Sequence, residues 1–252
     1  MTVEQHTHRL GTVDETGQGT PASTWSAWQR PFDELDLSGW ERVLVVAPHP
    51  DDEVLGVGAL MAALVSRDAD VTVAAVTDGG AAYPLSPTLG PAALARVRVK
   101  ESDAACATLG VAPPHRLGLP DGAVADHERA LVEHLTVLLR PGTICLATWS
   151  GDGHPDHEAV GRAAAQACRD TGAVLVEYPV WMWHWSSPAD EAVPWHRARA
   201  ISLSAEQLAR KRRAVAHFVS QTQALSDHPA DAAVLPPFVI DRLVRDQEVV
   251  LL

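Results

Sequence analysis

Residues 43–53 constrain what this chain can fold into more than any other stretch. They run from a short apolar segment into a cluster of turn and acidic residues, Val-Leu-Val-Val-Ala followed by Pro-His-Pro-Asp-Asp-Glu. An apolar run that ends abruptly in turn residues is typical of a buried parallel strand. In open α/β sheets, ligands bind beyond the carboxyl ends of such strands. The polar cluster therefore lies where a binding site is expected.

The acidic part of this cluster indicates a bound cation. Asp51, Asp52 and Glu53 are adjacent, and crowded carboxylates oppose one another's ionisation unless a positive charge lies among them. A divalent metal is the obvious candidate. The carboxylates also suit the first turn of a following helix, where each contributes about 0.3–1 kcal/mol. That capping role is compatible with a metal, but it gives no reason for His49.

The rest of the chain alternates predicted strands and helices. We expect strands over residues 42–47, 71–77, 115–119, 143–148 and 173–177. We expect helices over 54–67, 91–109 and 123–139, and another after a loop over 149–155 that runs to about residue 171. Residues 198–203 and 248–252 are strand-like, and a helix to about residue 219 opens with a capping box of Ser204 and Gln207. This alternation predicts an α/β protein, a three-layer sandwich with a mostly parallel central sheet.

Length and composition fit one core. The chain has 252 residues, of which 46% are hydrophobic, enough for one substantial α/β domain. We expect that domain over residues 25–252, behind a flexible, polar N-terminal tail over residues 1–24. The tail lacks the apolar segment of a secretory signal, and no apolar run approaches the ~20 residues of a membrane span.

Charge and cysteine usage narrow the class of protein further. A formal net charge of −12 argues against a nucleic-acid partner or an anionic membrane surface. Cys106, Cys145 and Cys168 are odd in number and widely spaced, which favours reduced thiols in a cytoplasmic protein. The oligomeric state is left open, and a homo-oligomer is compatible with the sequence.

A second polar cluster follows the strand predicted over residues 143–148. Residues 151–158 read Gly-Asp-Gly-His-Pro-Asp-His-Glu and open the next predicted helix. Clusters at the carboxyl ends of two parallel strands can face one site. Hydrolytic zinc sites use three histidine or carboxylate ligands and keep a position for water. His49, Asp52 and His157 would supply that set.

The remaining residues of the two clusters suggest a hydrolytic reaction. A bound zinc lowers the pKa of its water toward about 7, so a nearby carboxylate can accept the proton. Asp51 would be that general base. His154, as an imidazolium free of the metal, could stabilise an oxyanion or protonate a leaving amine. Either motif alone could be an ordinary turn, but two such clusters at predicted strand ends favour the metal site.

Both clusters, in this order, resemble the PIG-L/LmbE-like deacetylase family. The resemblance covers most of residues 40–222 and includes Thr77-Asp78-Gly79, Arg98-x-x-Glu101, Leu109-Gly110, residues 117–122 and the segment 211–221. It implies a Rossmann-like sheet and a hydrolase with one zinc ion per chain, another divalent metal being left open. The implied reaction removes an N-acetyl or other N-acyl group from a GlcNAc-type amino sugar or glycoconjugate.

The resemblance assigns roles that agree with the chemical argument. The metal ligands are His49, Asp52 and His157; the base is Asp51; the group assisting the transition state is His154. It further implies that Arg98 and Asp121 hold the sugar. The plainer interpretations are a surface helix charge for Arg98 and a turn residue for Asp121.

A tryptophan-rich segment departs from the family pattern. Trp181, Trp183 and Trp185 could stack on a sugar or an apolar aglycone, or anchor a protein interface. We take Trp183 as a candidate substrate contact and Trp149 as a separate one. Alternation at period two would equally suit an edge strand packed against the core.

Three alternatives remain beside the leading hypothesis. A mycothiol S-conjugate amidase or a natural-product glycoside deacylase would share the fold and the metal site. A non-catalytic sugar-binding relative would be expected to have lost ligands or the base, and all five positions are present. A nucleotide-binding Rossmann domain is disfavoured, because the first strand meets His-Pro-Asp-Asp and not a Gly-x-Gly-x-x-Gly turn.

Overall fold

The computed structural model describes residues 17–28 and 30–252. In this part of the chain, eight strands form one sheet in the order β1-β7-β8-β6-β5-β2-β3-β4. Neighbouring strands are parallel, except that β8 runs antiparallel to both β6 and β7. The strands are β1 (Asp33–Glu34), β2 (Arg42–Ala47), β3 (Asp70–Ala75), β4 (His115–Arg116), β5 (Ile144–Thr148), β6 (Val174–Tyr178), β7 (Ala198–Ser202) and β8 (Gln247–Leu251). The predicted mostly parallel sheet is confirmed.

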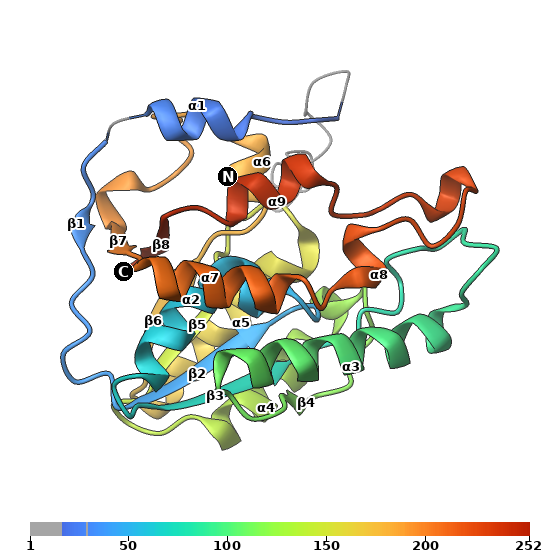
Figure 1. The fold of residues 1–252 in the computed structure, drawn as a ribbon. Coiled ribbons are helices and arrows are strands. Elements are labelled where there is room, and N and C mark those ends of the chain that lie inside the picture. The colour runs from blue at the N-terminus through green and yellow to red at the C-terminus, as the bar shows by residue number, and fades with distance from the viewer. Residues whose placement is uncertain (1–16, 29) are drawn as a thin grey trace.

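Helices cover both faces of the sheet, which confirms the three-layer sandwich (Figure 1). One face carries α2 (Asp52–Val65), α3 (Pro91–Leu109) and α7 (Ala205–Val215). The other carries α4 (Glu128–Leu138) and α5 (Pro155–Thr171). The shorter helices are α1 (Ala22–Ala27), α6 (Met182–Trp185), α8 (Val219–Thr222), α9 (Pro237–Leu243) and the 3-10 turns η3 (Val124–His127), η4 (Trp195–Arg197) and η5 (Pro229–Asp231). None of the helices described is long and apolar enough to cross a membrane.

The central strand β2 shows why its sequence is a continuous apolar run. Val43 and Val45 pack into the core on the α2 side, whereas Leu44 and Val46 pack on the α5 side. A parallel strand covered by helices on both faces has no solvent-facing side chains to alternate with buried ones. Residues 43–47 are accordingly buried throughout.

Most predicted elements are present with small differences at their ends. β2 and α3 have the predicted bounds. The strand predicted over 115–119 is assigned only at His115–Arg116, because Gly118 has a φ of 70°; the amides of Leu117 and Leu119 still donate to the carbonyls of Ala75 and Val76, both at 2.9 Å. The helix predicted over 123–139 is η3 followed by α4. The helix predicted to about residue 219 ends at Val215, and the non-helical Phe218, with a ψ of 55°, separates it from the short helix α8.

Some predictions for the less regular segments were incomplete. The tryptophan-rich segment forms the helical turn α6 and not an edge strand. Elements α1, β1 and α9 were not predicted, because each is short and shows no clear hydrophobic period. The predicted tail falls largely on residues 1–16, which lie outside the described residues. Further along it, Thr20 bonds the backbone of His184 and Ser186 through its own N–H and hydroxyl.

Helix α2, which begins at the first polar cluster, is broken near its middle. Val57 has non-helical dihedral angles, φ −137° and ψ 23°. Just before it, a Cβ at Gly56 would overlap the ring of Tyr178, whose hydroxyl donates to the Val46 carbonyl at 2.9 Å. Only glycine therefore allows β6 and α2 to approach so closely.

A buried ion pair satisfies the backbone groups exposed by this break. Lys211 Nζ donates to the Leu55 carbonyl and to Glu248 Oε1, both at 2.7 Å. Glu248 in turn accepts the amides of Ala59 at 2.9 Å and Leu60 at 2.7 Å. Buried backbone groups without partners are costly. The pair thus joins α7 and β8 to the helix that carries the first cluster.

We expect Glu248→Ala to destabilise the protein by about 3–5 kcal/mol, because it leaves the Lys211 ammonium buried without its counterion. The free energy of unfolding, measured by urea titration, tests this. Glu133→Ala is the matched control, because Glu133 pairs with Arg129 on the exposed face of α4; its cost should be about 0.5 kcal/mol or less. Equal, small effects of the two substitutions would contradict the capping role of Glu248.

Candidate metal centre and active site

The two polar clusters meet at one edge of the sheet. β2 and β5 are parallel neighbours, so the loops that follow them lie side by side. The first loop carries His49, Asp51 and Asp52, and the second leads into α5 with His154 and His157. The imidazole rings of His49 and His157 are 5.4 Å apart, centroid to centroid. Residues more than a hundred positions apart in the sequence therefore share one site.

Three side chains at this edge form a compact set of metal-ligand type. Asp52 Oδ2 lies 3.2 Å from Nδ1 of His49 and 3.3 Å from Nε2 of His157. One ligand atom from each residue lies within 4.8 Å of the others. Asp52 and His157 are buried and His49 is nearly so. The set predicted from the sequence is thus assembled and could hold one metal ion.

Three further carboxylates hold the imidazoles from behind. Nδ1 of His157 lies 2.9 Å from Asp152, and Nε2 of His49 lies 3.1 Å from both Asp156 and Asp121. A carboxylate on one ring nitrogen fixes the tautomer and turns the other nitrogen toward a metal. Neither Asp152 nor Asp156 was predicted from the sequence to have a role. Their presence within the same histidine cluster was the only signal for them.

A second group of metal-ligand type overlaps the first. It consists of His49, His154 and Asp156. Ligand atoms of this group are already engaged in hydrogen bonds. The Asp156 carboxylate accepts the amides of Gly122 and Val124 at 2.8 and 3.1 Å. Nδ1 of His154 likewise accepts the Asp156 amide at 3.2 Å. The first group is the better candidate.

The polar atoms of the first group fit a cation. Nε2 of His157 is buried and makes no hydrogen bond among the described residues, although the Asp52 carboxylate lies 3.3 Å away as an ion-pair partner. Burial lowers the pKa of His157, but Asp52 and Asp152 outweigh it and raise the pKa to about 9. Burial raises the pKa of Asp52, but His157 and His49 hold that pKa far below its usual value. The surroundings therefore favour positive charge at the point where the three side chains meet.

Asp51 lies beside this group in a strained backbone conformation. It has a φ of 146° and a ψ of −30°, a region that residues other than glycine rarely adopt. Its carboxylate is buried and lies 2.9 Å from the Arg98 guanidinium. Burial raises the pKa of Asp51 to about 7 despite the opposing charge of Arg98. A carboxyl group that titrates near neutral pH suits a general base.

The two predicted sugar contacts, Arg98 and Asp121, are tied into the site. Arg98 is buried, so the plainer interpretation as a surface charge is wrong; it donates to the carbonyls of Gly79 at 3.0 Å and Pro50 at 3.1 Å. Asp121 accepts the Ala81 amide at 2.6 Å. Burial raises the pKa of Asp121, but its bond to His49 lowers that pKa to about 2 overall.

His154 faces the same space in its neutral form. Its ring lies 5.0 Å from that of His49 and 4.8 Å from that of His157. Burial, with the positive charge of these two rings, lowers the pKa of His154 to about 3. Since its Nδ1 accepts the Asp156 amide, the proton of the neutral ring is on Nε2. The surroundings favour this form over the imidazolium considered from the sequence.

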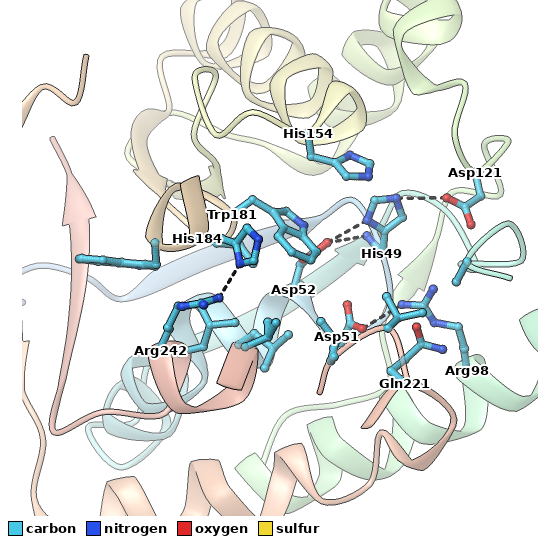
Figure 2. Close-up of a pocket in the computed structure, with 18 of the residues that line it drawn as sticks. His49, Asp51, Asp52, Arg98, Asp121, His154, Trp181, His184, Gln221 and Arg242 are labelled. Carbon is cyan, nitrogen blue, oxygen red and sulfur yellow. Dashed lines mark hydrogen bonds and ion pairs between the residues drawn. The ribbon is translucent and has the colours of Figure 1, made fainter. Parts of the chain in front are cut away.

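His49, Asp51, Asp52, Arg98, Asp121 and His154 line a cavity of about 300 Å³. Figure 2 shows Arg98, Asp121 and Gln221 on one side of Asp52, and Trp181, His184 and Arg242 on the other. Gln221 was not predicted from the sequence as a site residue. Apolar lining residues include Leu55, Val180, Trp183, Val234, Leu235, Val239 and Leu243.

The tryptophan candidates differ in their position. Trp183 lines the cavity, but its ring is 5% exposed and packs edge-on against Trp25 at 4.9 Å. Trp181 also lines the cavity and is more exposed. Trp149 is buried, stacks on Trp185 at 6.3 Å and is not among the lining residues.

Comparison with known proteins places this architecture among enzymes of one type. A family model described as PIG-L, GlcNAc-PI de-N-acetylase, matches residues 44–168. The diacetylchitobiose deacetylase of Thermococcus kodakarensis is 30% identical over 146 residues, 56% of this chain and 52% of that protein. The 1D-myo-inositol 2-acetamido-2-deoxy-alpha-D-glucopyranoside deacetylase 1 of Catenulispora acidiphila is 33% identical over 173 residues, 58% and 54% of the two chains. The chain thus spans about half the length of these curated relatives.

A solved structure extends the likeness to the fold. The zinc-inhibited form of teicoplanin deacetylase superposes with a TM-score of 0.55 and 28% identity, covering 72% of this chain and 85% of that one. The matched family segment contains both polar clusters and the strands that position them. By these sequence and structural matches, residues 44–168 form a domain similar to the PIG-L/LmbE-like deacetylases.

Proposed function

We propose that this protein is a metal-dependent hydrolase that removes an N-acetyl or other N-acyl group from a GlcNAc-type amino sugar or glycoconjugate. The observation that carries this proposal is the meeting of His49, Asp52 and His157, with Asp51 beside them, at a cavity lined by His49, Asp51 and Asp52. The Thermococcus and Catenulispora relatives, both named as deacetylases, support the reaction type.

The metal would be held by Nδ1 of His49, the Asp52 carboxylate and Nε2 of His157. Imidazole and carboxylate are ligands that zinc prefers, so we propose one zinc ion per chain. The existence of a zinc-inhibited form of the teicoplanin enzyme makes the metal's identity a question for direct analysis. When bound, such an ion polarises the amide carbonyl and makes water more acidic.

The protein's own groups would move the protons. Asp51 accepts a proton from the water that attacks the carbonyl carbon, and delivers it to the nitrogen as the C–N bond breaks. The products are a free amine and a carboxylate. Nε2–H of His154 donates a hydrogen bond to the oxygen that becomes negative in the tetrahedral intermediate. Arg98 holds the Asp51 carboxylate at 2.9 Å and so keeps the base in position.

The substrate contacts proposed from the family pattern are Arg98, Asp121 and Trp183. All three line the cavity. Arg98 and Asp121 would meet sugar hydroxyls on the polar side, and Trp183 would offer the narrow exposed edge of its ring. The single domain over residues 25–252, the cytoplasmic location and the oligomeric state stay predictions from the sequence.

A panel of N-acylated glycosides tests the proposed function directly. The purified protein should release a free amine from at least one GlcNAc-type member, stop when a chelator is added, and recover when zinc is restored. Bound metal without hydrolysis of any member would contradict the proposal and favour a sugar-binding relative. Hydrolysis restricted to mycothiol S-conjugates would favour the amidase instead.

Asp51→Asn should lower kcat about 10²- to 10⁴-fold, because the amide cannot accept the proton. Metal content should stay at the wild-type level, since Asp51 is not among the three grouped ligands. Steady-state kinetics and elemental analysis on the same preparation measure both quantities. Unchanged turnover would remove Asp51 as the base.

His157→Ala should abolish stoichiometric metal binding, because it removes one of three ligands and leaves Asp152 without its imidazole partner. Metal per chain is measured after dialysis against a weak chelator. His134→Ala on exposed α4 is the matched control and should retain the metal. Full occupancy in the His157→Ala variant would break the proposed ligand set.

A further inference from the structure

One side of the cavity is built from chain segments outside the matched family region. Residues 180–184 and 234–243 lie beyond residue 168, where the family match ends. They supply most of the apolar lining, which we call the apolar arm: Leu55, Val180, Trp181, Leu235, Val239 and Leu243. An N-acetyl group has a single methyl, so a substrate with no longer acyl chain would leave this apolar surface uncovered.

Helix α9 and the residues just before it present apolar side chains to the arm. Val239 and Leu243 are four residues apart, so they lie on one side of α9, and Leu235 lies immediately before the helix. All three line the cavity, and they are only 4%, 5% and 7% exposed. Figure 1 shows α9 beside α6, so the two unpredicted helices bound the arm together.

The wall of the arm opposite α9 is held by Asp152, the residue that also holds the proposed metal ligand His157. Asp152, which holds His157, also accepts the amides of Val180, Trp181 and Met182, each at 2.9 Å. Val180 and Trp181 are therefore fixed relative to the proposed metal ligands. The arm is a pre-formed part of the site.

A polar pair closes the far end of the arm. Arg242 bonds Nδ1 of His184 through its guanidinium and the Thr20 carbonyl through Nε, the latter at 2.6 Å. In Figure 2, this pair lies across Asp52 from Asp121 and Arg98. The cavity thus has a polar side and an apolar side, with the candidate metal ligands between them.

Amide geometry assigns a substituent to each side. An amide is planar and almost always trans, so its two substituents extend in opposite directions from the carbonyl carbon and the nitrogen. With the carbonyl at the metal centre, the sugar and the acyl group must occupy opposite sides of the cavity. Hydroxyl groups suit Arg98, Asp121 and Gln221, which leaves the apolar arm to the acyl group.

We propose that the apolar arm binds an aliphatic acyl chain longer than acetyl, so that the substrate class is an N-acylated amino sugar with a medium-length chain. This inference rests on the proposed deacylase function. Each methylene buried in the arm should raise kcat/KM by about fourfold until the arm is full.

A chain-length series tests the proposal. The substrates are methyl glycosides of glucosamine carrying N-acetyl, N-butanoyl, N-hexanoyl or N-octanoyl groups, and free amine is measured. We expect kcat/KM to rise with chain length and then level off. If the N-acetyl compound is hydrolysed as fast as the longer ones, the inference about acyl length is wrong, whereas the proposed deacylase function still stands. No amine from any member would instead reject the proposed function.

The aglycone is tested separately, because an alkyl aglycone could also seek an apolar surface. Octyl and methyl glycosides of N-acetylglucosamine are compared in the same assay. Nearly equal kcat/KM values support the assignment of the arm to the acyl group. A strong preference for the octyl glycoside, with no dependence on acyl length, would overturn it.

Two substitutions connect the length dependence to the arm. Val239→Phe should fill the arm and reduce the octanoyl-to-acetyl ratio of kcat/KM at least tenfold. Leu243→Ala should enlarge it and move the optimum to a longer chain. Val137→Phe, at a position 82% exposed on α4, is the matched control and should keep the wild-type profile. Unchanged profiles in both arm variants, with wild-type melting temperatures, would exclude the arm.

Discussion

The carboxylate of Asp152 is the contact on which both halves of the site depend. It is fully buried, and it holds His157 from behind while accepting three consecutive amides at the start of α6. A charged group without solvent persists in such a place only when its oxygens are satisfied. Asp152 therefore positions both the proposed metal ligand His157 and the backbone of one wall of the apolar arm.

Contacts with distant parts of the chain also explain how the broken helix α2 holds the first polar cluster in place. The glycine at position 56 admits the Tyr178 ring, and the break that follows is filled by Lys211 and Glu248. These partners come from α7 and β8, far along the chain. The position of Asp52 thus depends on residues that lie far along the chain from the two polar clusters.

The sequence predicted the regular centre of the fold better than its margins. β2, α3 and the clusters after β2 and β5 were predictable, because buried parallel strands are continuous apolar runs and because proline, glycine and aspartate mark their ends. The grouping of His49, Asp52 and His157 followed from that topology. Insertion of β8 between β6 and β7 was not predictable, since antiparallel pairing of distant strands leaves no local pattern.

The same reasoning shows why parts of the site were missed. Asp152 and Asp156 act through other side chains, and nothing in their spacing distinguishes them from turn residues. Gln221, Val239 and Arg242 reach the cavity from segments whose sequence has no clear period. Their place depends on long-range packing, which a local pattern does not encode.

The insertion of β8 also has a consequence for synthesis of the protein. β8 follows the other seven strands along the chain, yet it lies between β6 and β7. Until residue 251 has left the ribosome, those two strands each present an unpaired edge, to which a strand of another nascent chain can add. Chaperone protection of the emerging chain would matter most during this interval, when the sheet is almost finished but still open in its interior.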